Sequence, residues 1–158
     1  MVINRLKILL NQLAGDDEQA AAGHPFAAKE MAAAVLLVEA ASLDGNIGEA
    51  EMETIRRLVT ERFEMNREEA DLLFAEAKKV QSNSSQLIRF TKAVKDHYDE
   101  DERIELIEML WEVVYADRVL HEYESNLMRR VGGLIYVSDR DRGLAAKRVR
   151  RRLGIDNR

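Results

Sequence analysis

Apolar residues recur at three- and four-residue intervals along most of this chain, which is the spacing of helices with one buried face. Between residues 51 and 64 they fall on one side of such a helix, with charged residues opposite. The segments 26–43 and 104–116 are apolar almost all round, which indicates helices buried at the centre of a bundle. No stretch alternates as a strand does. The sequence therefore predicts an all-α fold, a single-domain bundle of about seven or eight helices.

Polar residues mark where several of these helices begin. Asn66 is followed three residues later by Glu69, which is the spacing of a capping box, and the helix that starts there should end near Val80. The acidic run Asp99 to Glu102 stands where the exposed N–H groups and the positive dipole end of the next helix favour carboxylates. Helix formation alone therefore explains these acids.

One pattern occurs twice along the chain. The first acidic turn (residues 44–51, Asp-Gly-Asn-Ile-Gly-Glu-Ala-Glu) follows the first buried helix, and the second acidic turn (residues 117–124) follows the other. Both pairs of matching acids are separated by one interval of 73 residues, from 44 to 117 and from 51 to 124. At the same interval the cap Asn66 falls on Asp139. We interpret this as an internal pseudo-two-fold repeat with halves of about 26–80 and 99–153.

Composition narrows the class of protein. The 158 residues include no cysteine, which excludes a disulfide framework, a thiolate metal site and a cysteine nucleophile. Residues 1–25 should form an N-terminal helix and linker, and residues 26–158 one domain. No apolar run reaches the roughly 18 residues of a membrane span, and no secretory signal is recognisable. We expect a cytoplasmic protein without a transmembrane segment.

Charge is distributed unevenly. The net charge of the chain is −5. Residues 139–158 contain eight basic and three acidic residues, a balance of +5, so the preceding residues carry −10. An acidic body attracts cations, and a basic last helix attracts anions. Cations are common near a helix C-terminus in any protein, so this run does not lead us to expect nucleic-acid binding.

The acidic turns have two interpretations. A carboxylate in the turn can approach another seven residues later, and a divalent cation such as calcium prefers such oxygen ligands. The candidate metal ligands are Asp44, Glu51, Asp117 and Glu124. Counting from Asp44, however, Ile55 takes the place of the bidentate Glu of an EF-hand, which excludes that motif. Alternatively, Glu51 and Glu124 cap their helices, which contributes about 1 kcal/mol without any ligand.

At these residues the sequence resembles a known family. The repeated Asp-Gly-x-Ile-x-x-x-Glu pattern after an Ala-rich helix resembles the tellurite-resistance TerB family, whose relatives include the N-terminal domains of some membrane-anchored DnaJ-type co-chaperones. The likeness covers about residues 26–153. It implies a pseudo-symmetric helical bundle with an acidic surface proposed to bind divalent metal, in proteins linked to tellurite or envelope stress resistance. Arg118 replaces the glycine of the second turn, and its guanidinium competes with a cation there.

The remaining residues do not assemble an enzyme motif. His24, His97 and His121 are far apart, and neither a Gly-rich phosphate loop nor a serine nucleophile motif is present. The sequence thus predicts a non-enzymatic domain that binds a divalent cation. The alternative is a metal-free protein–protein interaction or co-chaperone-like module, motivated by the apolar face of residues 2–13. Its partner would be an unknown protein, with membrane-associated proteins among the candidates.

Overall fold

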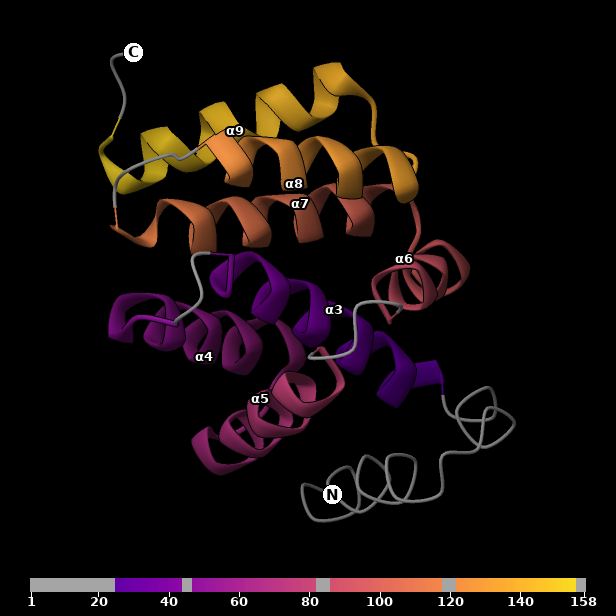
Figure 1. The fold of residues 1–158 in the computed structure, drawn as a ribbon, viewed down its shortest axis with the longest axis vertical. Coiled ribbons are helices and arrows are strands. Elements are labelled where there is room, and N and C mark those ends of the chain that lie inside the picture. Colours follow the sequence, from indigo (N-terminus) through magenta and orange to yellow (C-terminus); the bar gives the residue numbers. More distant parts are fainter. Residues whose placement is uncertain (1–24, 44–46, 82–85, 118–121, 156–158) are drawn as a thin grey trace.

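The computed structural model describes residues 25–43, 47–81, 86–117 and 122–155, which form seven α-helices and one short 3-10 helix (Figure 1). The elements are α3 (Pro25–Ala41), α4 (Glu49–Phe63), α5 (Arg67–Gln81), α6 (Gln86–His97), α7 (Glu100–Val114), η1 (Tyr115–Asp117), α8 (Glu122–Leu134) and α9 (Asp139–Leu153). The described residues contain no strand, and the predicted all-α bundle is confirmed. The helix expected before residue 25 lies outside the described residues.

Helix α3 occupies the centre of the fold and packs against α4, α5, α6 and α7 (Figure 1). Every residue from Met31 to Val38 is buried, with at most 7% of its surface exposed. The alanines in this stretch let neighbouring helices approach closely, while its valines and leucines bury apolar area. The nearly continuous apolar sequence of α3 is thus explained by contact on all sides.

Helix α7 is the second central helix. It packs against α3 and α4 on one side and against α8 and α9 on the other. Its buried apolar residues include Leu106, Ile107, Leu110 and Val114. In Figure 1, α7, α8 and α9 form one group, α3, α4 and α5 form another, and α6 closes the side of the bundle against α3 and α8.

The helix starts follow the predicted capping chemistry with one correction. Asn66 and Glu69 exchange side chain–backbone hydrogen bonds of 2.8 and 3.0 Å, as the capping box requires. Asp99 and Glu102 do the same at the start of α7. The match of the cap Asn66 with Asp139 is wrong, because the N-cap of α9 is Ser138, whose hydroxyl accepts a hydrogen bond from the Asp141 amide.

The helix boundaries can be compared with the predicted repeat. Helix α4 begins at Glu49 and α8 at Glu122, which are 73 residues apart, whereas α5 and α9 begin 72 residues apart, at 67 and 139. These starts lie close to the interval of the two acidic turns. The repeat of backbone geometry in the two halves stays a prediction.

Candidate functional site

The first acidic turn leads from α3 into α4, and Glu51 is its one predicted ligand that the structure describes. Glu51 accepts a hydrogen bond of 2.7 Å from the Gly48 amide, so its carboxylate caps the helix as predicted. A Cβ atom on residue 48 would lie 2.5 Å from Glu51 Oε1, and glycine there makes this close approach feasible. The capping bond turns the carboxylate back toward the turn. Asp44 lies outside the described residues.

The second acidic turn begins at the end of η1. Asp117 is the last residue of η1, but the placement of its side chain lies outside what the structure describes. Glu124, in the first turn of α8, is buried, with 6% of its surface exposed. The second turn thus presents a far less accessible carboxylate than the first, where Glu51 is half-buried.

The described elements that flank the two acidic turns lie on the same side of the bundle. The end of α3, the start of α4 and η1 lie together there, and α4 contacts η1 (Figure 1). Within the described residues, no group of three or more Asp, Glu, His or Cys side chains could hold a metal ion. The structure therefore positions Glu51 and Glu124, while the four-residue metal assignment stays a prediction.

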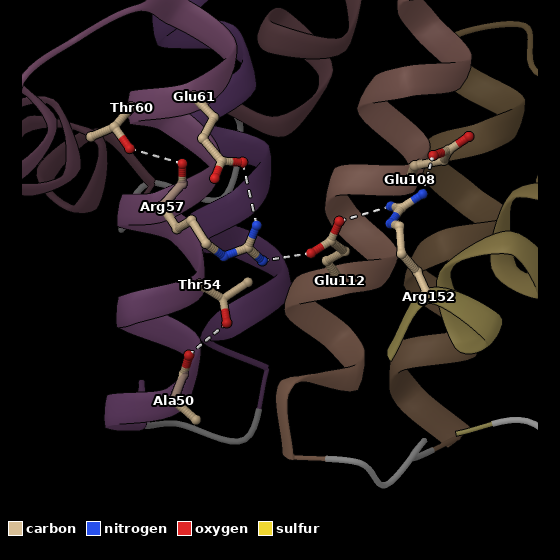
Figure 2. Close-up of polar contacts among 8 residues, drawn as sticks. All are labelled: Ala50, Thr54, Arg57, Thr60, Glu61, Glu108, Glu112 and Arg152. Carbon is tan, nitrogen blue, oxygen red and sulfur yellow. Dashed lines mark hydrogen bonds and ion pairs between the residues drawn. The ribbon is translucent and has the colours of Figure 1, made fainter. Parts of the chain in front are cut away.

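A cluster of ion pairs joins α4, α7 and α9 beside these turns. Figure 2 shows Glu112 of α7 between two guanidinium groups, with Arg57 of α4 donating to Oε1 at 2.6 Å and Arg152 of α9 donating to Oε2 at 2.8 Å. Arg152 also donates to Glu108 at 3.1 Å. Arg148 donates to the other oxygen of Glu108 at 2.8 Å. Two acids on α7 thus hold three arginines on its neighbours.

The environment of Glu112 keeps it ionised. Burial raises the pKa of its carboxyl, but the hydrogen bonds and positive charges of Arg57 and Arg152 outweigh this, so that the pKa lies below its ordinary value. Burial also disfavours the charged form of Arg152 and so lowers its pKa. Its hydrogen bonds to Glu112 and Glu108 outweigh this, so the pKa of Arg152 lies above its ordinary value. The cluster is therefore a set of mutually neutralising charges at neutral pH.

A cleft of about 400 Å³ opens beside this cluster. Its lining mixes three arginines and three glutamates with Leu58 and Met109: Arg57, Arg62, Arg152, Glu61, Glu108 and Glu112. The opposite charges balance, and several are already paired with each other. These ion pairs connect α4, α7 and α9, but the cleft has no net charge that would attract a small ion.

A second cleft, of about 260 Å³, lies between the start of α3, the end of α4 and the start of α7. Lys29 donates to Glu102 at 2.7 Å, and its ammonium lies 4.9 Å from the centre of the Tyr98 ring. The Tyr98 hydroxyl donates to the Lys29 carbonyl at 2.7 Å. Burial raises the pKa of Tyr98, as do the charges of Glu102 and Glu30. Tyr98 is thus a fixed hydrogen-bond donor at neutral pH.

Sequence reasoning missed the buried acids of these clefts. Glu112 interrupts the apolar run of α7, and the fully buried Glu30 interrupts that of α3. A single carboxylate inside an otherwise apolar helix is the signal that could have found them, because such a group is buried only with charged or hydrogen-bonding partners. The identity of those partners depends on helix packing and could not be read from the chain.

Comparison with known families identifies the class of protein. Residues 30–147, well over half of the chain, match the family model described as Tellurite resistance protein TerB. The match begins in α3, ends in α9 and spans both acidic turns. The chain belongs to the TerB family, as the resemblance had implied.

Two further findings concern other known proteins and membrane spans. The curated proteins and the solved structures yield no match to the chain. Over the part of the chain that the structure describes, no helix combines the length and apolar content needed to cross a membrane.

Proposed function

We propose that this TerB-family domain is a non-enzymatic binding domain that holds a divalent cation such as calcium at its acidic turns, in a pathway of tellurite or envelope stress resistance. The observation that supports it is the orientation of Glu51. Its Oε1 atom is held by the Gly48 amide, while Oε2 makes no hydrogen bond to a described residue. A carboxylate fixed by one oxygen can use the other as a cation ligand with little further loss of conformational freedom.

The first acidic turn is the better candidate of the two. Its sequence places Gly45 and Asn46 beside Asp44, whereas Arg118 stands beside Asp117 in the second turn. A guanidinium near a carboxylate competes with a metal ion for it. Burial of Glu124 adds to this difference, because a cation there must lose more of its water. We therefore expect the first turn to fill before the second.

Calorimetric titration of calcium into the full chain, freed of metal with a chelator, tests the proposal. With few carboxylates at a site, the dissociation constant should be on the order of 10⁻⁴ to 10⁻³ M. Asp44→Ala combined with Glu51→Ala should abolish the first binding event. Glu68→Ala combined with Glu100→Ala removes the same charge from exposed positions and should leave it intact.

Two results would contradict the proposal: absence of cation binding at millimolar calcium, or equal losses in the two double variants. The alternative, a metal-free interaction module, is favoured by one observation, the large exposed apolar side chains Ile88 and Tyr136, with 56% and 70% of their surfaces accessible. A protein partner whose binding is insensitive to a chelator and lost in Ile88→Asp would support that module.

A further inference from the structure

The outer face of α9 carries a basic stripe, which we define as Arg140, Leu144, Lys147 and Arg151. These residues follow one another at intervals of four, three and four, so they lie on one side of the helix. All four are exposed. The opposite side of α9, with Ala145, Ala146 and Val149, is buried. Figure 1 shows α9 at the outer edge of the bundle, and the stripe lies on the side of the helix opposite its buried residues.

The cations of the basic stripe are not used within the fold. The other arginines of α9 have partners: Arg142 pairs with Asp139, Arg148 and Arg152 with Glu108, and Arg150 with the Tyr115 hydroxyl. By contrast, Arg140, Lys147 and Arg151 form no ion pair or hydrogen bond through their side chains with any described residue. Three positive charges therefore project from the face opposite the core.

Helix stability does not account for this stripe. Arg140 is the second residue of α9, at the end where the helix dipole disfavours a cation, and Lys147 lies in the middle of the helix. Only Arg151 stands in the last turn, where a cation is favoured. A general need for surface charge would also mix both signs, yet residues 142–155 of the chain contain no Asp or Glu.

We propose that the basic stripe of α9 is a docking surface for a membrane rich in anionic phospholipid. Arginine and lysine contact headgroup phosphates, and Leu144, 39% exposed in the middle of the stripe, can enter the boundary with the acyl chains. A single apolar residue within a row of cations fits that boundary. Arginine and lysine also contact the phosphates of nucleic acid, whereas the acyl boundary of a membrane offers the exposed Leu144 an apolar environment.

The charge of the remaining chain sets the orientation of docking. Residues 1–138 carry a net charge of −10, which an anionic surface repels, so approach through the α9 face is favoured. Each basic residue near such a surface strengthens binding about fivefold, and three together strengthen it roughly a hundredfold. Binding should therefore be weak, reversible and sensitive to salt.

Co-sedimentation of the full chain with vesicles tests this proposal. In low salt and chelator, the protein should bind phosphatidylcholine vesicles containing about one third phosphatidylserine but not pure phosphatidylcholine vesicles. The triple variant Arg140→Glu, Lys147→Glu, Arg151→Glu should lose at least about a hundredfold in affinity, and Leu144→Ser about threefold. Because the chelator removes divalent cations, failure here is distinct from failure of the cation-binding proposal.

A matched variant controls for net charge. Arg67→Glu, Lys78→Glu and Lys92→Glu change the charge equally on α5 and α6 and should retain vesicle binding. The triple α9 variant must keep the helix content and urea unfolding of the native chain. If it unfolds, the single variants Arg140→Glu and Lys147→Glu replace it, and each should weaken vesicle binding about fivefold. The proposal is overturned if the native chain ignores anionic vesicles, if the control loses as much affinity, or if duplex DNA or polyglutamate outcompetes the vesicles.

Discussion

Glu112 shows how a single charged residue is accommodated in an apolar helix. Moving a carboxylate out of water is costly, and only good geometry with further hydrogen bonds offsets this cost. Here both oxygens are satisfied, one by Arg57 and one by Arg152, at 2.6 and 2.8 Å. The two arginines come from different helices, so the acid also fixes the position of α4 and α9 relative to α7.

The first prediction concerns the loss of this charge. Glu112→Gln should lower the free energy of unfolding by on the order of 2 kcal/mol at pH 7, because two charge-assisted hydrogen bonds are weakened. Urea unfolding at several pH values measures it. The folded-state pKa of Glu112 lies below its ordinary value of 4.5, so its contribution is present above about pH 4.5 and is lost as the pH falls through the folded-state pKa.

A neighbouring acid provides the control. Glu61 also pairs with Arg57, but at 3.4 Å and with 65% of its side chain exposed. Glu61→Gln should therefore cost less than about 0.5 kcal/mol. If the two variants lose equal stability, or if Glu112→Gln is as acid-sensitive as the native chain, the role given to the Glu112 pairs is incorrect.

The second prediction concerns Gly48 and the cap of α4. In Gly48→Ala the new methyl group would meet Glu51 Oε1, so the carboxylate must move and the capping bond weakens. The expected loss of stability is about 0.5–1 kcal/mol by thermal or urea unfolding. Gly143→Ala, in the open middle of α9, should instead gain about 0.5–1 kcal/mol, because no atom lies near its Cβ and alanine favours helix.

At the scale of elements, local signals were enough to place most helices. The capping box at Asn66, the acidic helix start at Asp99 and the apolar periodicity use only residues close in sequence, and all three predictions are confirmed. The 73-residue interval places the N-cap of α9 one residue too late, at Asp139, because α9 begins only 72 residues after α5 and its N-cap is Ser138. The fold class could thus be predicted from the sequence, while the N-cap residue of α9 could not.

Less of the candidate site than of the fold could be predicted from the sequence. The capping role of Glu51 follows from its spacing after Gly48, since both atoms belong to one helix turn. The bonds of Glu112 to Arg57 and Arg152 span 55 and 40 residues and depend on how α4 and α9 pack against α7. Periodicity predicts which face of a helix is buried, but not which side chain lies across from it.

The third prediction concerns the end of α8. The Val137 amide bonds to the Gly132 carbonyl at 2.8 Å, and Tyr136 between them takes a left-handed backbone with φ of 63°. This is the position where helices usually place glycine. Tyr136→Gly should relieve the strain and raise stability by about 0.5–1 kcal/mol.

Alanine at the same position separates strain from side-chain contact. Lys95 lies 4.6 Å from the centre of the Tyr136 ring, a contact worth about 0.5 kcal/mol at an exposed site. Tyr136→Ala loses this contact and keeps the left-handed strain, so it should be less stable than the native chain by about 0.5 kcal/mol. Equal unfolding midpoints for the glycine and alanine variants would show that backbone strain is not the governing factor.

At the scale of the whole molecule, the two predicted halves share one core. Helix α3 belongs to the first half but packs against α6 and α7, and α4 packs against α7 and η1. The pair Lys29–Glu102 and the pair Arg57–Glu112 also cross between the halves. Separation of the halves would therefore expose the apolar surface of both central helices and break these two ion pairs.

The last prediction is that the domain unfolds as one cooperative unit. Trp111, the only tryptophan in the chain, lies buried in α7 and stacks on Tyr115 at 5.4 Å, so its fluorescence reports on the second half. Far-ultraviolet circular dichroism reports on all the helices. Because α3 and α7 bury each other, both probes should give one urea midpoint, and fragments 1–83 and 84–158 should each be largely unfolded alone. Separate midpoints, or an independently folded fragment with native helix content, would show instead that the halves are distinct folding units.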